Sequence, residues 1–123
     1  MSVIVRDDGF TTDGGRVWLD LPPDTAPEAL APLRHMPAIR IRFDSFADGR
    51  GFTLASLLRR AGFSGRLRAF GPLIADQYAM ARRSGFDEVE IPDEIAARQP
   101  EALWIARAES LSRDYRARMR RPG

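Results

Sequence analysis

The clearest pattern in the chain is the alternation of apolar and polar positions between residues 38 and 92. Ile39, Ile41 and Phe43 alternate with arginines, and this period of two predicts a β-strand with one apolar face. Similar short runs predict two more strands, so that the predicted strands cover residues 38–43, 67–70 and 89–91. Because a central parallel strand is usually apolar on both faces, the arginines predict that one face of the sheet meets solvent or a partner chain.

Two stretches with apolar residues at helical spacing lie between these strands. The first is predicted to begin with Thr53 as its N-cap and to end at Gly62; the second should begin at Gly71-Pro72 and end at Gly85. The predicted inward stripes are Leu54, Leu57 and Leu58, and then Leu73, Ile74, Gln77, Tyr78 and Ala81. The pattern Arg-Arg-x-Gly-Phe closes both stretches, at residues 59–63 and 82–86, so the two units are expected to end alike.

The order strand–helix–strand–helix–strand with short connections predicts a small α/β fold in two or three layers, with a mostly parallel sheet and right-handed crossovers. An open sheet of flavodoxin-like or Rossmann-like type is favoured over a barrel fragment, because eight strands do not fit in 123 residues. The length predicts one domain. It comprises an N-terminal extension (1–37), a βαβαβ core (38–92) and a C-terminal helical segment (93–123).

The flanking segments have weaker patterns. Residues 3–5 and 17–19 are strand candidates for a hairpin or one edge of a sheet, and a short helix is predicted to begin at Thr25. The C-terminal segment predicts an amphipathic helix interrupted near Pro100, with a stripe of Trp104, Ala108, Leu111, Tyr115 and Met119. We expect this stripe to pack against the sheet; a helical dimer interface, and hence a homo-oligomer, is the alternative.

Composition excludes several kinds of chemistry. The chain has no Cys, so thiol nucleophiles, disulfides and thiolate metal sites are excluded, and all 19 basic residues are Arg, so no lysine Schiff base is possible. Apolar residues make up 44% and charged residues 29%, as in ordinary globular domains. No apolar run is long enough for a bilayer span, and the first residues do not resemble a signal peptide. A cytoplasmic location is therefore expected, without a membrane partner.

The formal net charge is +2, but the C-terminal twenty residues carry six arginines against Glu109 and Asp114. Such a tail suggests nucleic-acid binding as one alternative. Arginine at a helix C-terminus also favours the negative end of the helix dipole, and this interpretation is preferred because no aromatic residues alternate with the last arginines. His35, the single histidine, is interpreted as a helix-end or surface residue.

The candidate site lies at the carboxyl ends of the predicted strands, where open parallel sheets bind ligands. The turn Asp48-Gly49-Arg50-Gly51 precedes a predicted helix and suits an anion held by backbone amides and the Arg50 guanidinium, with Asp76 and Gln77 orienting it. Alternatively, Arg50 pairs with Asp44 or Asp48 in a tight turn. A second alternative is a metal-assisted enzyme that uses Asp44, Asp48 and Asp76, although their spacing matches no known metal motif.

Two sequence blocks resemble a bacterial family, domain-of-unknown-function family 934. The first is Phe46-Ala-Asp-Gly-Arg-Gly-Phe52 followed by Thr-Leu-Ala-Ser-Leu-Leu-Arg59. The second comprises Gly71, Leu73, Ile74, Asp76, Gln77, Met80, Gly85, Phe86 and Asp87. Three positions depart from the usual pattern: Ser84 replaces a frequent Cys, Pro72 an Asp and Ala75 an Arg. A redox role of that Cys would be impossible in this chain.

The resemblance implies a biological context. Members tend to be encoded beside assimilatory sulfite reductase genes, and from this neighbourhood they are often labelled oxidoreductases of sulfite reduction. Nothing in the sequence resembles a flavin, nicotinamide or haem site, so no cofactor is assigned. The leading hypothesis is a non-catalytic accessory protein of sulfite reduction that binds an oxyanion and a partner such as sulfite reductase; an enzyme of the same pathway is the competing hypothesis.

Overall fold

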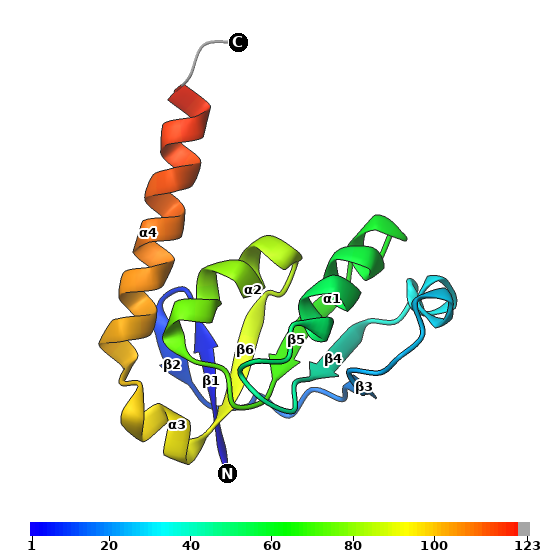
Figure 1. Cartoon of the computed structure of the whole chain (residues 1–123), viewed down its shortest axis with the longest axis horizontal. Coiled ribbons are helices and arrows are strands. Elements are labelled where there is room, and N and C mark those ends of the chain that lie inside the picture. Colours follow the sequence, from blue (N-terminus) through cyan, green and yellow to red (C-terminus); the bar gives the residue numbers. More distant parts are fainter. Residues whose placement is uncertain (121–123) are drawn as a thin grey trace.

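The computed structural model describes the backbone of residues 1–120 and the side chains of residues 1–111. Six strands form one open sheet in the order β2-β1-β6-β5-β4-β3 (Figure 1). The strands are β1 (Ser2–Arg6), β2 (Gly9–Thr11), β3 (Leu19–Leu21), β4 (Ala38–Arg42), β5 (Arg66–Phe70) and β6 (Glu88–Pro92). Strands β3 to β6 are parallel, whereas β1 is antiparallel to both of its neighbours.

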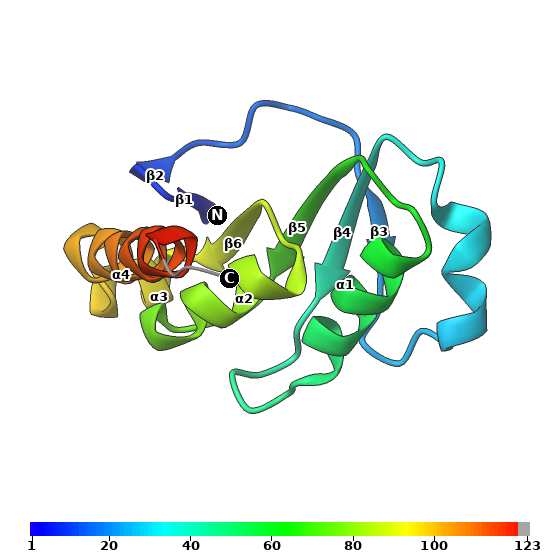
Figure 2. The same ribbon diagram turned by 90° about the horizontal axis from the view of Figure 1, so that it is seen from above.

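The predicted βαβαβ core is confirmed. Helix α1 (Arg50–Arg60) connects β4 to β5, and α2 (Tyr78–Ser84) connects β5 to β6. Both helices cover the same face of the sheet, so the domain has two layers (Figure 2). The apolar core lies between them, where Ile39 pairs in register with Leu67 and Ala69 with Val89. The α/β class with a mostly parallel sheet is therefore as the sequence predicts.

The repeated pattern Arg-Arg-x-Gly-Phe terminates α1 and α2 in the same way. Its glycines, Gly62 and Gly85, adopt positive φ angles of 105° and 116°, a conformation that favours glycine over other residues. In each copy the first arginine donates to the carbonyl of the phenylalanine four residues on, at 3.2 Å for Arg59 and 2.7 Å for Arg82. Both phenylalanines are buried. The motif is thus a helix stop that anchors the following strand.

The predicted starts of both helices need correction. Helix α1 begins at Arg50 rather than after Thr53, because the Asp48 carboxylate accepts the Arg50 backbone N–H at 3.2 Å and stabilises an earlier start. Before α2 the chain first forms a 3₁₀ turn (Ala75–Gln77); the backbone N–H of Ile74, the residue before this turn, donates to the Gln77 side chain at 3.1 Å. Helix α2 is therefore shorter than predicted.

The N-terminal residues join the main sheet, and their predicted hairpin was assigned to the wrong partner. Strand β1 forms its hairpin with β2, which Gly9 begins at a φ of 124°, whereas residues 19–21 form β3 at the opposite edge. Leu19 and Leu21 lie beside Ile39 and Ile41, so the apolar alternation of β3 matches that of β4. The helix predicted at Thr25 is two 3₁₀ turns (Pro27–Ala29 and Ala31–Leu33), because Pro32 cannot donate a helical hydrogen bond.

A charged contact attaches the β1–β2 turn to the helix layer. The Tyr78 hydroxyl donates to the Asp7 carboxylate at 2.5 Å, and Arg82 donates to the same carboxylate at 3.0 Å. Partial burial opposes ionisation of Asp7, but these donors outweigh it and lower its pKa. Burial and the neighbouring Asp7 carboxylate raise the pKa of Tyr78. The phenol therefore stays protonated and serves as a structural donor.

The C-terminal segment forms α3 (Asp93–Arg98) and α4 (Glu101–Arg120), separated near Pro100 as predicted. Trp104 and Ala108 are buried, as the stripe predicts, but α4 packs on α2 and β2 rather than across the sheet. Beyond these contacts α4 extends away from the domain (Figure 1). The predicted roles of Tyr115, Met119 and the terminal arginines concern side chains outside the described residues. No helix in the described part of the chain has the length and apolarity that crossing a membrane requires.

Candidate functional site

The face of the sheet opposite the helices is charged. Register places Asp20 beside Arg40, Arg40 beside Arg68, and Arg68 beside Glu88, so that charges run across four strands. The irregular segment 12–18, which connects β2 to β3, crosses on this side (Figure 2). We call it the helix-free face. The arginines of β4 thus lie on a face without helices, although Arg40 is half-buried among other strands rather than freely exposed.

The centre of this face is a buried ion-pair network. Arg68 is 2% exposed and donates to Glu88 at 2.7 Å and to Glu90 at 3.0 Å. Arg40 links Glu90, at 2.8 Å, to Asp20, at 2.6 Å. Burial opposes ionisation of Glu88, but the hydrogen bonds from Arg66 and Arg68 outweigh it and lower its pKa. The charges are therefore held in one geometry before any ligand arrives.

A hollow of about 480 Å³ opens beside this network. We call it the arginine hollow; its lining is Arg6, Gly14, Arg16, Trp18, Arg66, Arg68 and Glu88. Four guanidinium groups thus face one carboxylate in its wall. Arg66 donates to Glu88 at 2.7 Å, and Arg6 lies 3.5 Å from the same oxygen. Segment 12–18 forms one wall of the arginine hollow. There the Trp18 ring stacks on the Arg68 guanidinium, whose Cζ atom lies 4.2 Å from the ring centre.

Two residues that line the hollow, Trp18 and Arg16, have donors without an acceptor among the described residues. The Trp18 indole Nε1 is buried and lacks a hydrogen-bond partner among the described residues. The Arg16 side chain is exposed and makes no hydrogen bond or ion pair within the same part of the chain. Buried N–H groups are normally paired, so an unpaired one beside several arginines is unusual. The hollow is therefore rich in hydrogen-bond donors and in positive charge.

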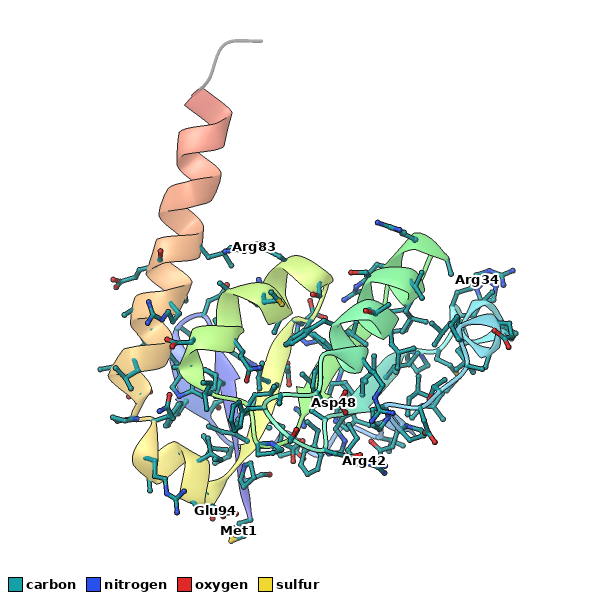
Figure 3. The ribbon with its side chains drawn as sticks, in the orientation of Figure 1. Met1, Arg34, Arg42, Asp48, Arg83 and Glu94 are labelled. Carbon is teal, nitrogen blue, oxygen red and sulfur yellow. The ribbon has the colours of Figure 1, made fainter. Side chains whose placement is uncertain are left out.

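The residues predicted to bind an anion are only partly brought together. Arg50 turns back onto Asp48, with its Nε and Nη2 atoms at 2.9 Å and 3.0 Å from the two carboxylate oxygens, as the alternative interpretation of this turn expects. Gln77 joins the same loop by donating to the Phe46 carbonyl at 2.6 Å. Asp76 instead faces α4 and accepts from Arg107 at 2.5 Å. Asp48 lies in the loop between the carboxyl end of β4 and the start of α1 (Figure 3).

The carboxylates of the metal-assisted alternative are each paired with an arginine. Asp44 accepts from Arg42 at 3.0 Å, whereas Asp48 and Asp76 bind the arginines named above. Among the described residues, no three His, Asp or Glu side chains lie close enough to hold a metal ion. The histidine, His35, is exposed. The arrangement of these carboxylates therefore favours structural ion pairs.

Comparison with known families matches residues 17–122 to the family described as bacterial protein of unknown function (DUF934). The chain belongs to this family. No curated protein and no solved structure matches it significantly. Of the positions that depart from the usual DUF934 pattern, Ser84 lies in the last turn of α2 and donates to the Met80 carbonyl at 2.8 Å.

Gly51, in the first DUF934 block, has a packing role. A Cβ atom at this position would overlap the Phe43 ring, which is 2% exposed and packs 4.9 Å from the Phe52 ring centre. Gly51→Ala should therefore lower the free energy of unfolding by about 1–3 kcal/mol through overpacking. Gly49→Ala is the matched control, because its Cβ would meet no atom within 4 Å. Urea denaturation measures both, and equal effects would contradict the packing role.

Sequence reasoning did not find the arginine hollow. Its residues come from β1, segment 12–18, β5 and β6, which are far apart in the chain. A signal was nevertheless present: Arg66 and Arg68 alternate along one strand, and Glu88 and Glu90 alternate along the next. Adjacent strands with opposite charges at the same period are expected to pair across a polar face.

Proposed function

We propose that this protein is a non-catalytic accessory protein of sulfite reduction and sulfate assimilation, which acts in the cytoplasm and binds a partner enzyme of that pathway. The pathway comes from the family's gene neighbourhood. The observation that carries the binding role is the helix-free face, which presents arginines from a rigid sheet. The partner that fits best is sulfite reductase, bound through an acidic surface.

The geometry suits binding because the face is held in place from within. Ion pairs join the strands at the centre of the face: Arg40 on β4 binds Glu90, and Arg68 on β5 binds Glu88. The backbone beneath the exposed arginines is therefore firmly positioned. Around this centre Arg6, Arg42 and Arg66 keep 47%, 54% and 37% of their side-chain surface exposed. Arginine is well suited to such an interface, because its planar group binds carboxylates with two hydrogen bonds. A preorganised positive face gives specificity and rapid association with an acidic partner.

Capture from sulfate-grown cells, followed by mass spectrometry, tests this role. The tagged wild-type protein is expected to recover sulfite reductase. Arg16→Glu reverses one exposed charge on the helix-free face, a charge without a partner among the described residues, and should reduce recovery about tenfold, since like charges at an interface are strongly unfavourable. Arg83→Glu makes the same change on α2, in the helix layer, and should recover as much as the wild type (Figure 3).

Two results would contradict the proposal. Failure of the wild-type protein to enrich sulfite reductase over an untagged control would remove the pathway assignment. Equal loss of recovery in Arg16→Glu and Arg83→Glu would show that net charge, rather than the helix-free face, governs capture. Recovery of other proteins without sulfite reductase would not support the role.

A further inference from the structure

We infer that the arginine hollow is a binding site for an oxyanion, either free or carried on a small molecule. This inference rests on the proposed function, because the oxyanion would bind on the same helix-free face that is proposed to bind the partner enzyme. It concerns residues outside the Asp48–Gly51 turn. Three features of the described residues carry it: the hollow is lined by more guanidinium groups than carboxylates, the Arg16 side chain has no partner among them, and neither has the buried Trp18 N–H group.

The excess of donors follows from the contacts around Glu88. Arg66 and Arg68 bind its two oxygens at 2.7 Å and 2.6 Å, and Arg6 approaches at 3.5 Å. Each guanidinium carries five N–H donors, whereas a carboxylate offers about four acceptor sites. Arg68 also donates to Glu90 at 3.0 Å, but among the described residues Arg6 and Arg66 pair with Glu88 alone, and Arg16 adds a fourth guanidinium to the wall. Such a wall would bind a ligand that brings further negatively charged acceptors.

Trp18 supplies the second, independent feature. One face of its ring stacks on the Arg68 guanidinium, and this contact holds the indole in place. Its Nε1 is buried and unpaired among the described residues, and burial without an acceptor is unfavourable. The neighbouring carboxylate of Asp13 forms an ion pair with Arg68 at 3.6 Å, too long for a good hydrogen bond, and it does not pair with the Trp18 indole.

The chemistry of the wall selects the class of ligand. A cation is disfavoured by four guanidinium groups, and an apolar molecule would leave their donors unpaired. An oxyanion such as sulfite, sulfate or phosphate has only acceptors, and several oxygens to share among arginine and indole donors. The volume of about 480 Å³ lies within the usual range of small-molecule sites, so the oxyanion group need not be a free ion.

Isothermal titration calorimetry at constant ionic strength tests the inference. The wild-type protein is titrated with sulfite, sulfate and phosphate, with acetate and chloride as controls. Trp18→Phe removes the indole N–H while keeping a ring against Arg68, and Arg16→Gln removes the Arg16 charge. Each should weaken oxyanion binding about tenfold, the effect of losing one charged hydrogen bond. Arg83→Gln, with the same charge change on α2, should bind as the wild type does.

Thermal unfolding checks that Trp18→Phe and Arg16→Gln stay folded, as expected because neither Trp18 Nε1 nor the Arg16 side chain has a partner among the described residues to lose. Absence of oxyanion binding in the wild type, or equal binding by all three variants, would overturn the inference and leave the hollow as a structural ion-pair cluster. Acetate binding as tightly as sulfate would also overturn it, since the hollow would then not distinguish sulfite, sulfate or phosphate from a simple carboxylate.

The outcomes for the site and for the proposed function can be separated. Trp18→Phe changes no charge, so capture of sulfite reductase by this variant tests the interface without the oxyanion. Capture without oxyanion binding by the wild type would refute the inference and preserve the accessory role. Oxyanion binding that depends on Trp18 and Arg16, without capture, would support the site and refute the partner.

Discussion

Arg68→Met is expected to lower the free energy of unfolding by about 3–5 kcal/mol, because it removes one partner from a buried ion-pair network. Arg68 is 2% exposed and binds both Glu88 and Glu90, which are themselves buried. Urea denaturation at pH 7 measures the change. The matched control is Arg42→Met on the same face; Arg42 is 54% exposed and pairs with the exposed Asp44, so its loss should cost about 1 kcal/mol or less. Equal effects would refute the network's role.

The same variant should also change how stability depends on pH. In the wild type the pKa of Glu88 is lowered, so its ionised form contributes stability above the ordinary value of 4.5, and this contribution is lost as pH falls through the folded-state value. Without Arg68, burial of Glu88 favours the protonated form. The difference between wild type and variant should therefore shrink between pH 7 and pH 4. A constant difference would show that lost packing, rather than lost charge pairing, causes the effect.

Trp104→Ala should lower the free energy of unfolding by about 3–5 kcal/mol, the usual cost of truncating a large buried aromatic side chain. Trp104 is fully buried, lies edge-on to the Tyr78 ring at 6.0 Å, and donates from its indole to the Gln99 carbonyl at 2.7 Å. It therefore attaches α4 to α2 and orients the break between α3 and α4.

Leu103→Ala provides the control for this contact. Leu103 precedes Trp104 on the same helix but is 45% exposed, so its truncation should cost less than about 1 kcal/mol. Both variants are compared by urea denaturation with far-ultraviolet circular dichroism. If Trp104→Ala were no more harmful than Leu103→Ala, α4 would be attached to the domain by contacts other than this tryptophan.

The elements predicted correctly are those set by residues close together in the sequence. Alternation along residues 38–43 gives β4, and Gly62 and Gly85 end the helices because positive φ favours glycine. The partners of β1 and of residues 19–21 were not predictable in this way. Strand pairing at the sheet edges depends on distant contacts, such as that between Leu21 and Ile41, which the period of a short run does not specify.

The candidate site illustrates the same limit. The sequence indicates that Asp48 and Arg50 lie in a turn, but their mutual pairing depends on side-chain geometry. The arginine hollow needs both the register of β5 with β6 and the path of segment 12–18, which brings Trp18 to Arg68. Paired charge alternation was visible in the sequence, whereas the stacking of an irregular segment on a buried arginine was not.

The central claim is that the helix-free face binds an oxyanion at the arginine hollow. The most direct measurement is a titration with sulfite or sulfate that follows the two tryptophan indole N–H signals by ¹H–¹⁵N nuclear magnetic resonance at constant ionic strength. Trp104 is an internal control, because its indole is already bonded to Gln99. We predict that the Trp18 signal shifts and saturates while the Trp104 signal stays in place. No shift of the Trp18 signal, or equal shifts of both, would contradict the account.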